Sequence, residues 1–342
     1  MISTKTMKTQ NKTTMQALIA AEANAPFVLT EVERPVAAAG QVLVRIIASG
    51  VSVLDNKIRT GKGGHAQQPL PAILGMDFAG KVEAVGEGVT RFKAGDEVYG
   101  LAGGIGGLQG TYAQYGAFDA DLLALKPSNL SMRQSASMPL NFITAWEGLV
   151  DRAKVHQGQK VLVHGGAGGV GHLAVQIAKA FGAWVYATGS AAQQPYIESI
   201  GATFIDYHEK TVGQYVNEYT DGEGFDIVYD TLGGATLDAS FAAARFYTGH
   251  VVSCLGWGEH KLAPLSFRGA TYSGVFTLMP MITGKGRKHH GEIMEEATKL
   301  AEAGKMVPLV DERRFTLATA NEAHQILEHG KAIGKLVIDV RE

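Results

Sequence analysis

The stretch that decides the fold is VLVHGGAGGVGHLAVQIAKAFGA, residues 161–183. It begins with a short β-branched run, which predicts a strand. Gly166, Gly168 and Gly171 then give the spacing G-x-G-x-x-G, and apolar residues recur at helical intervals from Val170 to Phe181. A strand, a glycine turn and a helix in this order are typical of a site for the diphosphate of a dinucleotide.

Each glycine of this motif has its own expected role. Gly166 would permit the tight turn, Gly168 would let the backbone approach a pyrophosphate, and Gly171 would let the helix pack on the strand. The N–H groups at the helix start, including those of Gly169 and Val170, would face the phosphates with the positive end of the helix dipole. The structural alternative is an ordinary glycine-rich turn between a strand and a helix.

Length and composition exclude several classes of protein. The chain has 342 residues, which suits two domains, and a net charge of −2, which gives no indication of a nucleic-acid or anionic-membrane surface. Cys254 is the only cysteine, so an intramolecular disulfide and a thiolate zinc cluster are both excluded. No apolar run approaches the roughly 20 residues of a membrane span. Residues 1–14 are expected to be a flexible polar leader, and the expected location is the cytoplasm.

Two patterns of secondary structure divide the chain. Residues 15–137 contain short alternating segments separated by glycine turns, which predict a β-barrel-like domain. Residues 138–279 alternate strands with helices, which predicts a parallel sheet with strands at 160–164, 184–188, 203–206, 226–229 and 250–255. Residues 280–342 give an amphipathic helix stopped by Gly304 and then a strand, a helix and a strand. The fold class is therefore α/β, with a doubly wound parallel sheet inserted between two parts of a β-rich domain.

Two further clusters are interpreted as structural. GLAGGIGGLQG, residues 100–110, lacks the spacing of the motif and precedes a strand, so we expect a loop. Histidine and glutamate gather at the start of the amphipathic helix, where we expect a solvated face on which Glu295 pairs with Lys299. The residues of this cluster are His289, His290, Glu292, Glu295 and Glu296.

The end of the second predicted strand bears on the nucleotide. A site that prefers NAD places an acidic residue about 20 residues past the motif, on the ribose 2′-hydroxyl. Thr188 stands there, and no Asp or Glu occurs from Trp184 to Gln194. A carboxylate about 4 Å from a 2′-phosphate would cost on the order of 4 kcal/mol at an effective dielectric near 20. Its absence, with Ser190 able to donate to the phosphate, favours NADP(H).

Four segments together resemble the medium-chain dehydrogenase/reductase superfamily, and most of all its zinc-independent quinone oxidoreductase, or zeta-crystallin-like, branch. The resemblance covers residues 15–340 and implies a Rossmann domain, a GroES-like catalytic domain and a homodimer joined through residues 246–276. The segments are residues 161–183, GMDFAGKVEAVGEGVTRFKAGDEVYG (75–100), LNFITAWEGL (140–149) and GKAIGKLVID (330–339).

The resemblance also implies that no zinc is bound. In the zinc enzymes of the superfamily, a Cys, a His followed by an acidic residue, and a second Cys hold the metal. Ser52, Met76 and Leu140 stand at these positions, and a hydroxyl, a thioether and an alkyl group do not make a catalytic zinc site. Without a Lewis acid the site suits hydride transfer to an electron-poor small molecule, either a quinone or the β-carbon of an α,β-unsaturated carbonyl.

Site residues are carried over from the same resemblance. Asn141 and Thr144 match positions beside the nicotinamide, and Ser52 and Lys57 match a wall of the substrate site, where Lys57 would donate to a carbonyl oxygen. The structural alternatives are a capping hydroxyl for Thr144 and a solvated Lys57. The other expected cofactor contacts are Thr188, Ser190, Tyr207, Leu232, Cys254, Leu255, Gly256, Phe276 and Thr277.

Several positions depart from the branch. Lys57 replaces its usual aromatic residue, which weakens the case for a quinone, and Gln193 stands where the branch often has a lysine for the 2′-phosphate. Tyr207 has the alternative of an exposed turn residue, and Cys254 that of a buried apolar side chain. Two competing functions remain: an enoyl-thioester reductase, and a nucleotide-binding protein with structural or regulatory duties.

Overall fold

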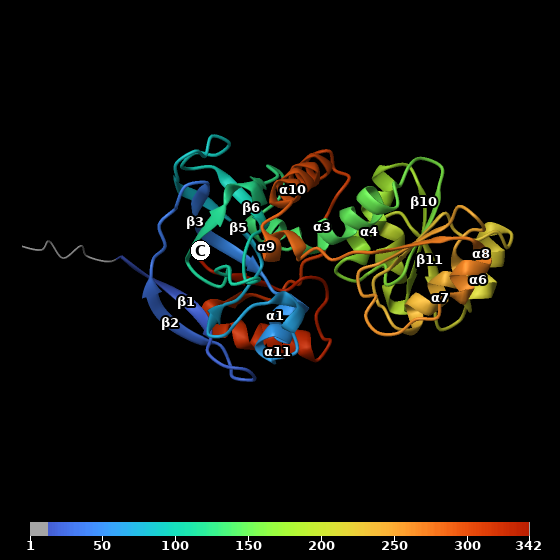
Figure 1. The fold of residues 1–342 in the computed structure, drawn as a ribbon, viewed down its shortest axis with the longest axis horizontal. Coiled ribbons are helices and arrows are strands. Elements are labelled where there is room, and N and C mark those ends of the chain that lie inside the picture. Colours follow the sequence, from blue (N-terminus) through green and yellow to red (C-terminus); the bar gives the residue numbers. More distant parts are fainter. Residues whose placement is uncertain (1–12, 342) are drawn as a thin grey trace, which may run out of the picture.

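The computed structural model describes residues 13–341, which form two lobes lying side by side (Figure 1). The blue, teal and red elements, from both ends of the chain, build one lobe. The elements between residues 160 and 274, coloured green through yellow to light orange, build the other, whereas the darker orange helices within residues 279–302 lie with the first lobe. The expected leader falls mostly outside the described residues, since its first 12 residues are not described.

The first lobe contains two β-sheets. The smaller has the order β2-β1-β4, with β1 (Thr14–Ala20), β2 (Val28–Glu33) and β4 (Ala72–Ile73). The larger has the order β15-β16-β3-β5-β6-β8, with β7 paired to β3. Its strands are β3 (Gln41–Gly50), β5 (Asp77–Val85), β6 (Glu97–Leu101), β7 (Tyr115–Asp119), β8 (Leu123–Leu125), β15 (Phe315–Thr316) and β16 (Val337–Asp339). Because β16 pairs antiparallel with β3, distant parts of the chain share one sheet.

Helices cover this sheet and close its edges. The 16-residue helix α10 (Arg287–Glu302) packs on β8, and Gly304 follows it with φ +69°, as the predicted helix stop requires. Of the predicted loop at 100–110, residues 102–110 lie outside helices and strands, whereas Gly100 and Leu101 end β6. The remaining helical elements are α1 (Val53–Arg59), η1 (Gly64–Ala66), η2 (Ala120–Leu122), α2 (Met132–Ala136), α9 (Met279–Thr283), η5 (Leu317–Thr319) and α11 (Ala320–Glu328).

The second lobe is built on a six-stranded parallel sheet. Its order is β11-β10-β9-β12-β13-β14, the order of a doubly wound fold whose switch point lies at β9. The five predicted strands are present, with ends that differ by up to two residues, and β14 adds an edge. The strands are β9 (Lys160–Val163), β10 (Trp184–Gly189), β11 (Thr203–Asp206), β12 (Ile227–Asp230), β13 (His250–Ser253) and β14 (Thr271–Gly274). The predicted fold class is confirmed.

The helical segment before this sheet is broken in two places. α2 ends at Ala136, and α3 (Pro139–Trp146) restarts with Pro139, whose missing N–H is tolerated only in a first turn. A π-helical turn, η3 (Glu147–Arg152), follows. The other helices are α4 (Gly171–Ala180), η4 (Ala191–Gln193), α5 (Gln194–Ser199), α6 (Val212–Thr220), α7 (Ala235–Ala243) and α8 (Ala263–Arg268).

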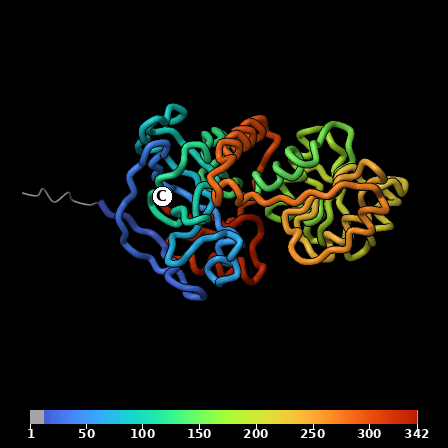
Figure 2. The backbone as a smooth tube through the Cα atoms, viewed as in Figure 1, coloured from blue at the N-terminus to red at the C-terminus, as the bar shows by residue number. Residues whose placement is uncertain are grey.

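The largest cluster of buried apolar side chains in the described chain contains residues of both lobes, and each lobe has a smaller cluster of its own. Phe142 and Trp146 of α3 stack with ring centroids 5.8 Å apart, and Phe181 meets Trp146 edge-on at 5.7 Å. After β14 the chain runs back past the junction of the lobes to α9 and α10 (Figure 2).

None of the helices in the described range combines the length and the apolar character that crossing a bilayer requires. The boundaries at 137/138 and 279/280 stay predictions.

A buried ion pair connects three distant segments at the junction of the lobes. The Nζ of Lys335 lies 2.8 Å from Oδ2 of Asp77, and the two side chains are 7% and 0% exposed. The other oxygen of Asp77 accepts the Leu140 N–H at 2.7 Å. The residues before β16 and the start of β5 are thereby held against the first turn of α3.

We predict that Lys335→Met destabilises the protein by about 3–5 kcal/mol, because it leaves a buried carboxylate without its counter-charge. Urea unfolding followed by circular dichroism measures the loss, and the double variant Lys335→Met/Asp77→Asn should recover part of it. Lys299→Met is the control, since that side chain is 67% exposed and pairs with Glu296 at the surface. A loss below about 1 kcal/mol for Lys335→Met would contradict the assignment.

Candidate active site at the glycine turn and the junction of the lobes

The turn after β9 depends on close backbone approaches. Gly165 has φ +72°, so Gly165, and not Gly166 as predicted, supplies the left-handed conformation of the tight turn. Gly166 is needed for a different reason, because a Cβ there would lie 2.6 Å from Cβ of Ala187 on β10. The three-glycine pattern predicted the correct segment. It assigned the tight turn to Gly166, one residue too late, because Gly165 lies before the pattern.

The start of α4 offers unpaired donors. A Cβ on Gly171 would lie 2.0 Å from the carbonyl oxygen of Gly165, so only glycine lets the helix sit this close to the turn. A Cβ on Gly168 would have only the carbonyl oxygen of Gly165 within 4 Å, at 3.1 Å. The other side of Gly168 is therefore free of contacts. Among residues 13–341, no acceptor pairs with the amides of Gly169, Val170 or Gly171. Three N–H groups at a helix start suit a phosphate ligand.

A buried carboxylate that the sequence analysis missed positions the loops after β12 and β13. Asp230 is fully buried and accepts the N–H groups of Leu232 at 3.1 Å and Gly233 at 3.0 Å, and the hydroxyl of Ser253 at 2.6 Å. The Ser253 oxygen in turn accepts the Leu255 N–H at 3.1 Å. Leu232 and Leu255, both expected cofactor contacts, are therefore fixed by one side chain. The only signal was an acidic residue ending a buried strand.

Other expected contacts lie along the same strand ends. Thr188 holds the turn, since its hydroxyl accepts the Gly165 N–H at 3.1 Å. Tyr207 is 54% exposed, stacks on His208, and donates its N–H to the carbonyl of Gly189, next to Ser190, at 3.4 Å. The roles of Thr188, Ser190, Tyr207 and Gly256 toward a cofactor stay predictions.

Cys254 lies at the end of β13, half-buried against the core. Burial raises the pKa of its thiol to about 12. The side chain is thus a neutral thiol at physiological pH, in agreement with the predicted apolar residue and not with a nucleophile.

Helix α3 faces the turn on one side and the segment after β14 on the other. A Cβ on Gly169 would lie 2.9 Å from Nδ2 of Asn141, which places that amide against the exposed turn. One helical turn further, the Thr144 hydroxyl donates to the Leu140 carbonyl at 2.7 Å and lies 3.1 Å from Oγ1 of Thr277. The structure thus brings together Thr144 and Thr277, 133 residues apart, and Thr144 also caps backbone as its structural alternative states.

The substrate-side wall is organised by a second buried carboxylate. Asp55 accepts the Ser52 N–H at 2.9 Å, the Tyr112 hydroxyl at 2.8 Å and the Gly75 N–H at 3.0 Å. Burial raises the pKa of Asp55 to about 6, although the Tyr112 hydroxyl and the amides act to lower it. Asp55 therefore holds Ser52, the N-cap of α1, close to the residue before Met76, and Asp77 holds Leu140.

An aromatic cluster spans the two lobes beside Lys57. The His65 ring lies 5.1 Å from Trp257 and 6.4 Å from Phe276, and Trp257 lies 6.0 Å from Phe276. Burial and then the nearby charge of Lys57 lower the pKa of His65. Lys57 is half-buried, and its ammonium group has no hydrogen-bond or ion-pair partner within the described chain. His65 and Trp257 were missed because no local pattern joins η1 to the loop after β13.

The histidine and glutamate cluster on α10 is the predicted solvated face only in part, since His289, Glu292 and Glu295 are exposed but His290 is not. His290 is fully buried and lies 3.1 Å from Oε1 of Glu147. Glu295 pairs with Arg91, while Lys299 pairs with Glu296. The helical spacing identified the helix correctly, but α10 turns this side of its N-terminal half toward η3.

Metal ligands are not grouped in the part of the chain that the structure describes. No set of three or more His, Cys, Asp and Glu side chains there is arranged to hold an ion. Ser52, Met76 and Leu140 replace the expected zinc ligands at the wall described above. That the protein acts without zinc stays a prediction. The chemistry of these three side chains supports it, because none of them is a usual zinc ligand.

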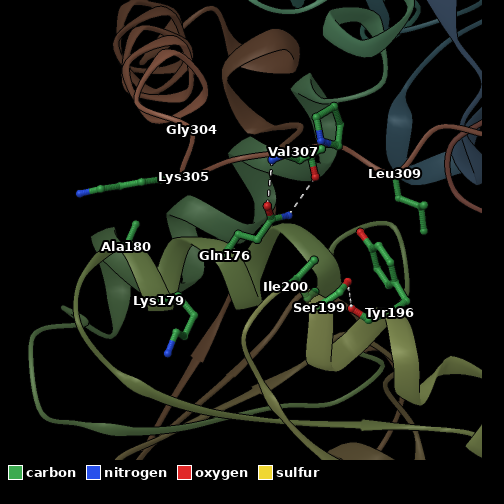
Figure 3. A pocket seen from close by; sticks show the side chains of 11 residues that line it. Gln176, Lys179, Ala180, Tyr196, Ser199, Ile200, Gly304, Lys305, Val307 and Leu309 are labelled. Atoms are coloured by element: carbon green, nitrogen blue, oxygen red, sulfur yellow. Dashed lines mark hydrogen bonds between the residues drawn. The ribbon is translucent and has the colours of Figure 1, made fainter.

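A separate cavity of about 570 Å³ lies away from the turn, at the other end of α4 (Figure 3). Gln176 stands beside it and bridges the lobes, accepting the Val307 N–H at 2.8 Å and donating to the Val307 carbonyl at 3.1 Å. Lys179 and Lys305 line its rim, and Tyr196 of α5 closes the opposite side. Its residues are not those of the strand ends, so we do not assign the cofactor to it.

Comparison with known proteins gives the family. Residues 38–128 match the profile described as "Alcohol dehydrogenase GroES-like domain", and residues 200–338 match that of "Zinc-binding dehydrogenase". The "2-methylene-furan-3-one reductase" of Solanum lycopersicum is 35% identical over 306 residues, which cover 87% of this chain and 71% of that protein. The chain belongs to the medium-chain dehydrogenase/reductase superfamily. It is accordingly an oxidoreductase that uses a nicotinamide cofactor.

Further relatives of this superfamily member are similar along most of its length. The chloroplastic "NADPH-dependent alkenal/one oxidoreductase" of Arabidopsis thaliana is 34% identical over 306 residues, covering 87% of this chain and 72% of that one. An alcohol dehydrogenase superfamily protein from Novosphingobium aromaticivorans is 56% identical, with a TM-score of 0.94 over 96% of this chain and 100% of that chain. The quinone oxidoreductase from Coxiella burnetii is 30% identical, with a TM-score of 0.81 over the same shares.

We predict that Gly171→Ala weakens the folded state of this oxidoreductase by about 1–3 kcal/mol and its nicotinamide nucleotide binding with it, because the new Cβ pushes α4 away from Gly165. Denaturant unfolding and calorimetric titration with NADPH measure the two effects. Gly213→Ala is the matched control: a Cβ added to this exposed glycine of α6 would have nothing within 4 Å, so the replacement should stabilise by about 0.4–1 kcal/mol. Equal behaviour of the two variants would refute the packing argument.

Proposed function

We propose that this protein is a zinc-independent, NADPH-dependent reductase that transfers hydride to a small electron-poor acceptor, an α,β-unsaturated carbonyl or a quinone. The observation that carries the proposal is the wall formed by the zinc positions and by the residues around Lys57. Its zinc positions hold Ser52, Met76 and Leu140, and its unpartnered cation is Lys57, beside the His65, Trp257 and Phe276 rings of the described chain. Such a wall suits an acceptor that is already conjugated and needs only charge stabilisation at oxygen.

The residues of the site would have different roles according to where they lie. The amides of Gly169, Val170 and Gly171 would hold the diphosphate, while Asn141, Thr144 and Thr277 would border the nicotinamide. Bound NADPH would supply the hydride. Lys57 would stabilise the oxyanion that develops on the acceptor, an attraction on the order of 4 kcal/mol at 4 Å and an effective dielectric near 20. The aromatic rings would exclude water and orient a planar acceptor.

The preference for NADPH is supported by the end of β10. No carboxylate occurs from Trp184 to Gln194, and the side chain of Gln193 accepts the Ser190 N–H at 3.0 Å, so it is held beside the site where the 2′-phosphate would bind. A similar protein from Arabidopsis thaliana is named as NADPH-dependent. With one cysteine, the chain also suits a reducing cytoplasm, which we propose as its location.

A homodimer is proposed through the edge of the second lobe. β14 is the last strand of the sheet, so one side of its backbone is open to another chain. Large side chains nearby are exposed: Tyr247 is 87% and Phe267 83% exposed. Sedimentation of the wild type beside Phe267→Asp would test this association.

We expect the oxidation of NADPH, followed at 340 nm, with a panel of an alkenal, a naphthoquinone and crotonyl-CoA. Turnover with the alkenal or the quinone, and a higher kcat/KM with NADPH than with NADH, would support the proposal. Turnover confined to crotonyl-CoA would instead indicate an enoyl-thioester reductase. Tight NADPH binding without turnover on any acceptor would indicate a binding protein.

Lys57→Ala should lower kcat/KM for the accepted carbonyl substrate by about 10- to 100-fold, since roughly 1.4 to 2.8 kcal/mol of charge stabilisation is lost. The same change should raise the pKa of His65, because it removes one of the two influences that lower it, and NMR titration reads this without any turnover. Lys62→Ala, an exposed lysine beyond α1, is the control. Unchanged turnover on every substrate would eliminate the donor role.

A further inference from the structure

His172, the second residue of α4, is enclosed between the glycine turn and the first lobe. Its side chain is 2% exposed, and its Nδ1 lies 2.8 Å from the carbonyl oxygen of Gly168 in the turn. The N–H of Leu309, in the segment between α10 and β15, donates to Nε2 at 3.2 Å. One imidazole ring therefore connects the turn that is expected to hold the diphosphate with a segment of the first lobe that lies 137 residues further along the chain.

The protons of this ring follow from its two partners. An amide N–H only donates and a carbonyl oxygen only accepts, so Nε2 is the bare nitrogen and Nδ1 carries the proton. The ring is neutral, because burial lowers the pKa of His172 to about 4, although the hydrogen bond to Gly168 acts to raise it. Both nitrogens are thus satisfied in one tautomer, and the rigid ring makes both contacts at once.

The segment around Leu309 is also attached to α4 and to the buried ion pair at the junction of the lobes. One helical turn further along α4, the Gln176 side chain accepts the Val307 N–H at 2.8 Å and donates to the Val307 carbonyl at 3.1 Å (Figure 3). The Leu309 carbonyl accepts the N–H of Lys335 at 2.9 Å, and Lys335 pairs with Asp77. This segment is therefore held both by α4 and by the first lobe.

The connections return to the glycine turn by a second route. Asp77 accepts the Leu140 N–H at 2.7 Å, which fixes the first turn of α3, and Asn141 of α3 lies against Gly169. The ion pair at the junction is thus connected to two side chains that contact the turn, Asn141 and His172. The position of the turn relative to the first lobe depends on these contacts.

The relative position of the two lobes decides whether hydride can be transferred. The second lobe would hold the nucleotide, whereas Ser52 and Lys57 of the substrate wall belong to the first lobe. A misplacement of about 1 Å between two reactants can cost on the order of 100-fold in rate. A side chain that fixes the turn relative to the first lobe would therefore affect the transfer without touching either reactant.

We propose that His172 is a positioning residue, which holds the diphosphate turn at a fixed position relative to the substrate wall by donating to Gly168 and accepting from Leu309. This inference rests on the nicotinamide cofactor of the proposed function. The two bonds of the ring have separate effects. The bond to Gly168 shapes the turn and so affects the affinity for the nucleotide. The bond from Leu309 places the turn between the lobes and so affects the transfer step.

Two variants separate these bonds. The side-chain amide of asparagine reaches about as far as Nδ1, so His172→Asn keeps a donor for Gly168 and loses the acceptor for Leu309. The longer side chain in His172→Gln keeps an acceptor near Nε2 and loses the donor at Gly168. Calorimetric titration measures Kd for NADPH, and stopped-flow absorbance at 340 nm measures the single-turnover rate on the substrate that the panel identifies.

We expect the two variants to have opposite effects. His172→Asn should retain Kd for NADPH within about twofold and lower the single-turnover rate about tenfold, since the turn keeps its shape but loses its attachment to the first lobe. His172→Gln should weaken NADPH binding about tenfold and retain the rate at saturating NADPH within about threefold. Thermal unfolding confirms that both variants are folded.

Hydrogen exchange at Leu309 gives a readout that needs neither a variant nor turnover. Because His172 connects this amide to the turn, NADPH should slow the exchange of the Leu309 N–H in the wild type by about threefold or more, and should not do so in His172→Asn. The matched control is His329→Asn. The His329 ring also lies against the carbonyl four residues before it, 2.6 Å from that of Gln325, but at the exposed end of α11, so wild-type values are expected.

Two results would overturn the inference: variants that change affinity and rate alike or not at all, or an exchange rate of Leu309 in the wild type that NADPH leaves unchanged. Absence of NADPH binding to the wild type would refute the proposed function, and the inference with it. Binding without turnover would refute the proposed function alone, since the exchange at Leu309 still shows whether His172 connects the turn to the first lobe.

Discussion

The site depends on one close contact, the approach of the first residue of α4 to the carbonyl of Gly165. No side chain fits between them, because a Cβ on Gly171 would lie 2.0 Å from that oxygen. The contact forces the chain through a left-handed Gly165 and leaves the amides of residues 169–171 without acceptors in the described chain. Those donors stand at the switch point of the parallel sheet, where open α/β folds bind ligands. The second lobe thus positions the amides of the expected anion site, and the first lobe supplies the wall opposite them.

Buried carboxylates fix the loops of the candidate site by accepting hydrogen bonds from them. Asp55, Asp77, Asp230 and Glu147 each accept at least two hydrogen bonds or charge-assisted contacts from segments distant in sequence. A hydrogen bond to a charged group contributes about 1.5–3 kcal/mol, more than a neutral one. Each carboxylate lies at or near a strand end or a helix start. The loops that carry Ser52, Leu140, Leu232 and Thr277 are therefore held by side chains that need not touch a ligand themselves.

Sequence patterns predicted what local spacing encodes. The helix from Val170, the strands of the parallel sheet and the stop at Gly304 follow from periodicity and glycine, and the structure contains them. The tight turn was assigned one residue late, because Gly165, the glycine with φ +72°, lies before the G-x-G-x-x-G pattern. His290 was placed in solvent because its burial depends on η3, a π-turn with no sequence signature. Trp257 and His65 meet only through the closure of the two lobes. Residue types at ligand positions, such as Ser52 and Met76, could be identified from the resemblance, but the carboxylates that position them could not.

We expect the amides at the start of α4 to hold the diphosphate of a nicotinamide nucleotide. Backbone amide NMR shifts and hydrogen exchange of residues 165–172, recorded with and without NADPH, test it most directly. The account predicts large shifts and increased protection at Gly169, Val170 and Gly171 on addition of NADPH, and none of comparable size on addition of nicotinamide mononucleotide, which lacks the diphosphate. Unchanged amides at these three residues under saturating NADPH would contradict it.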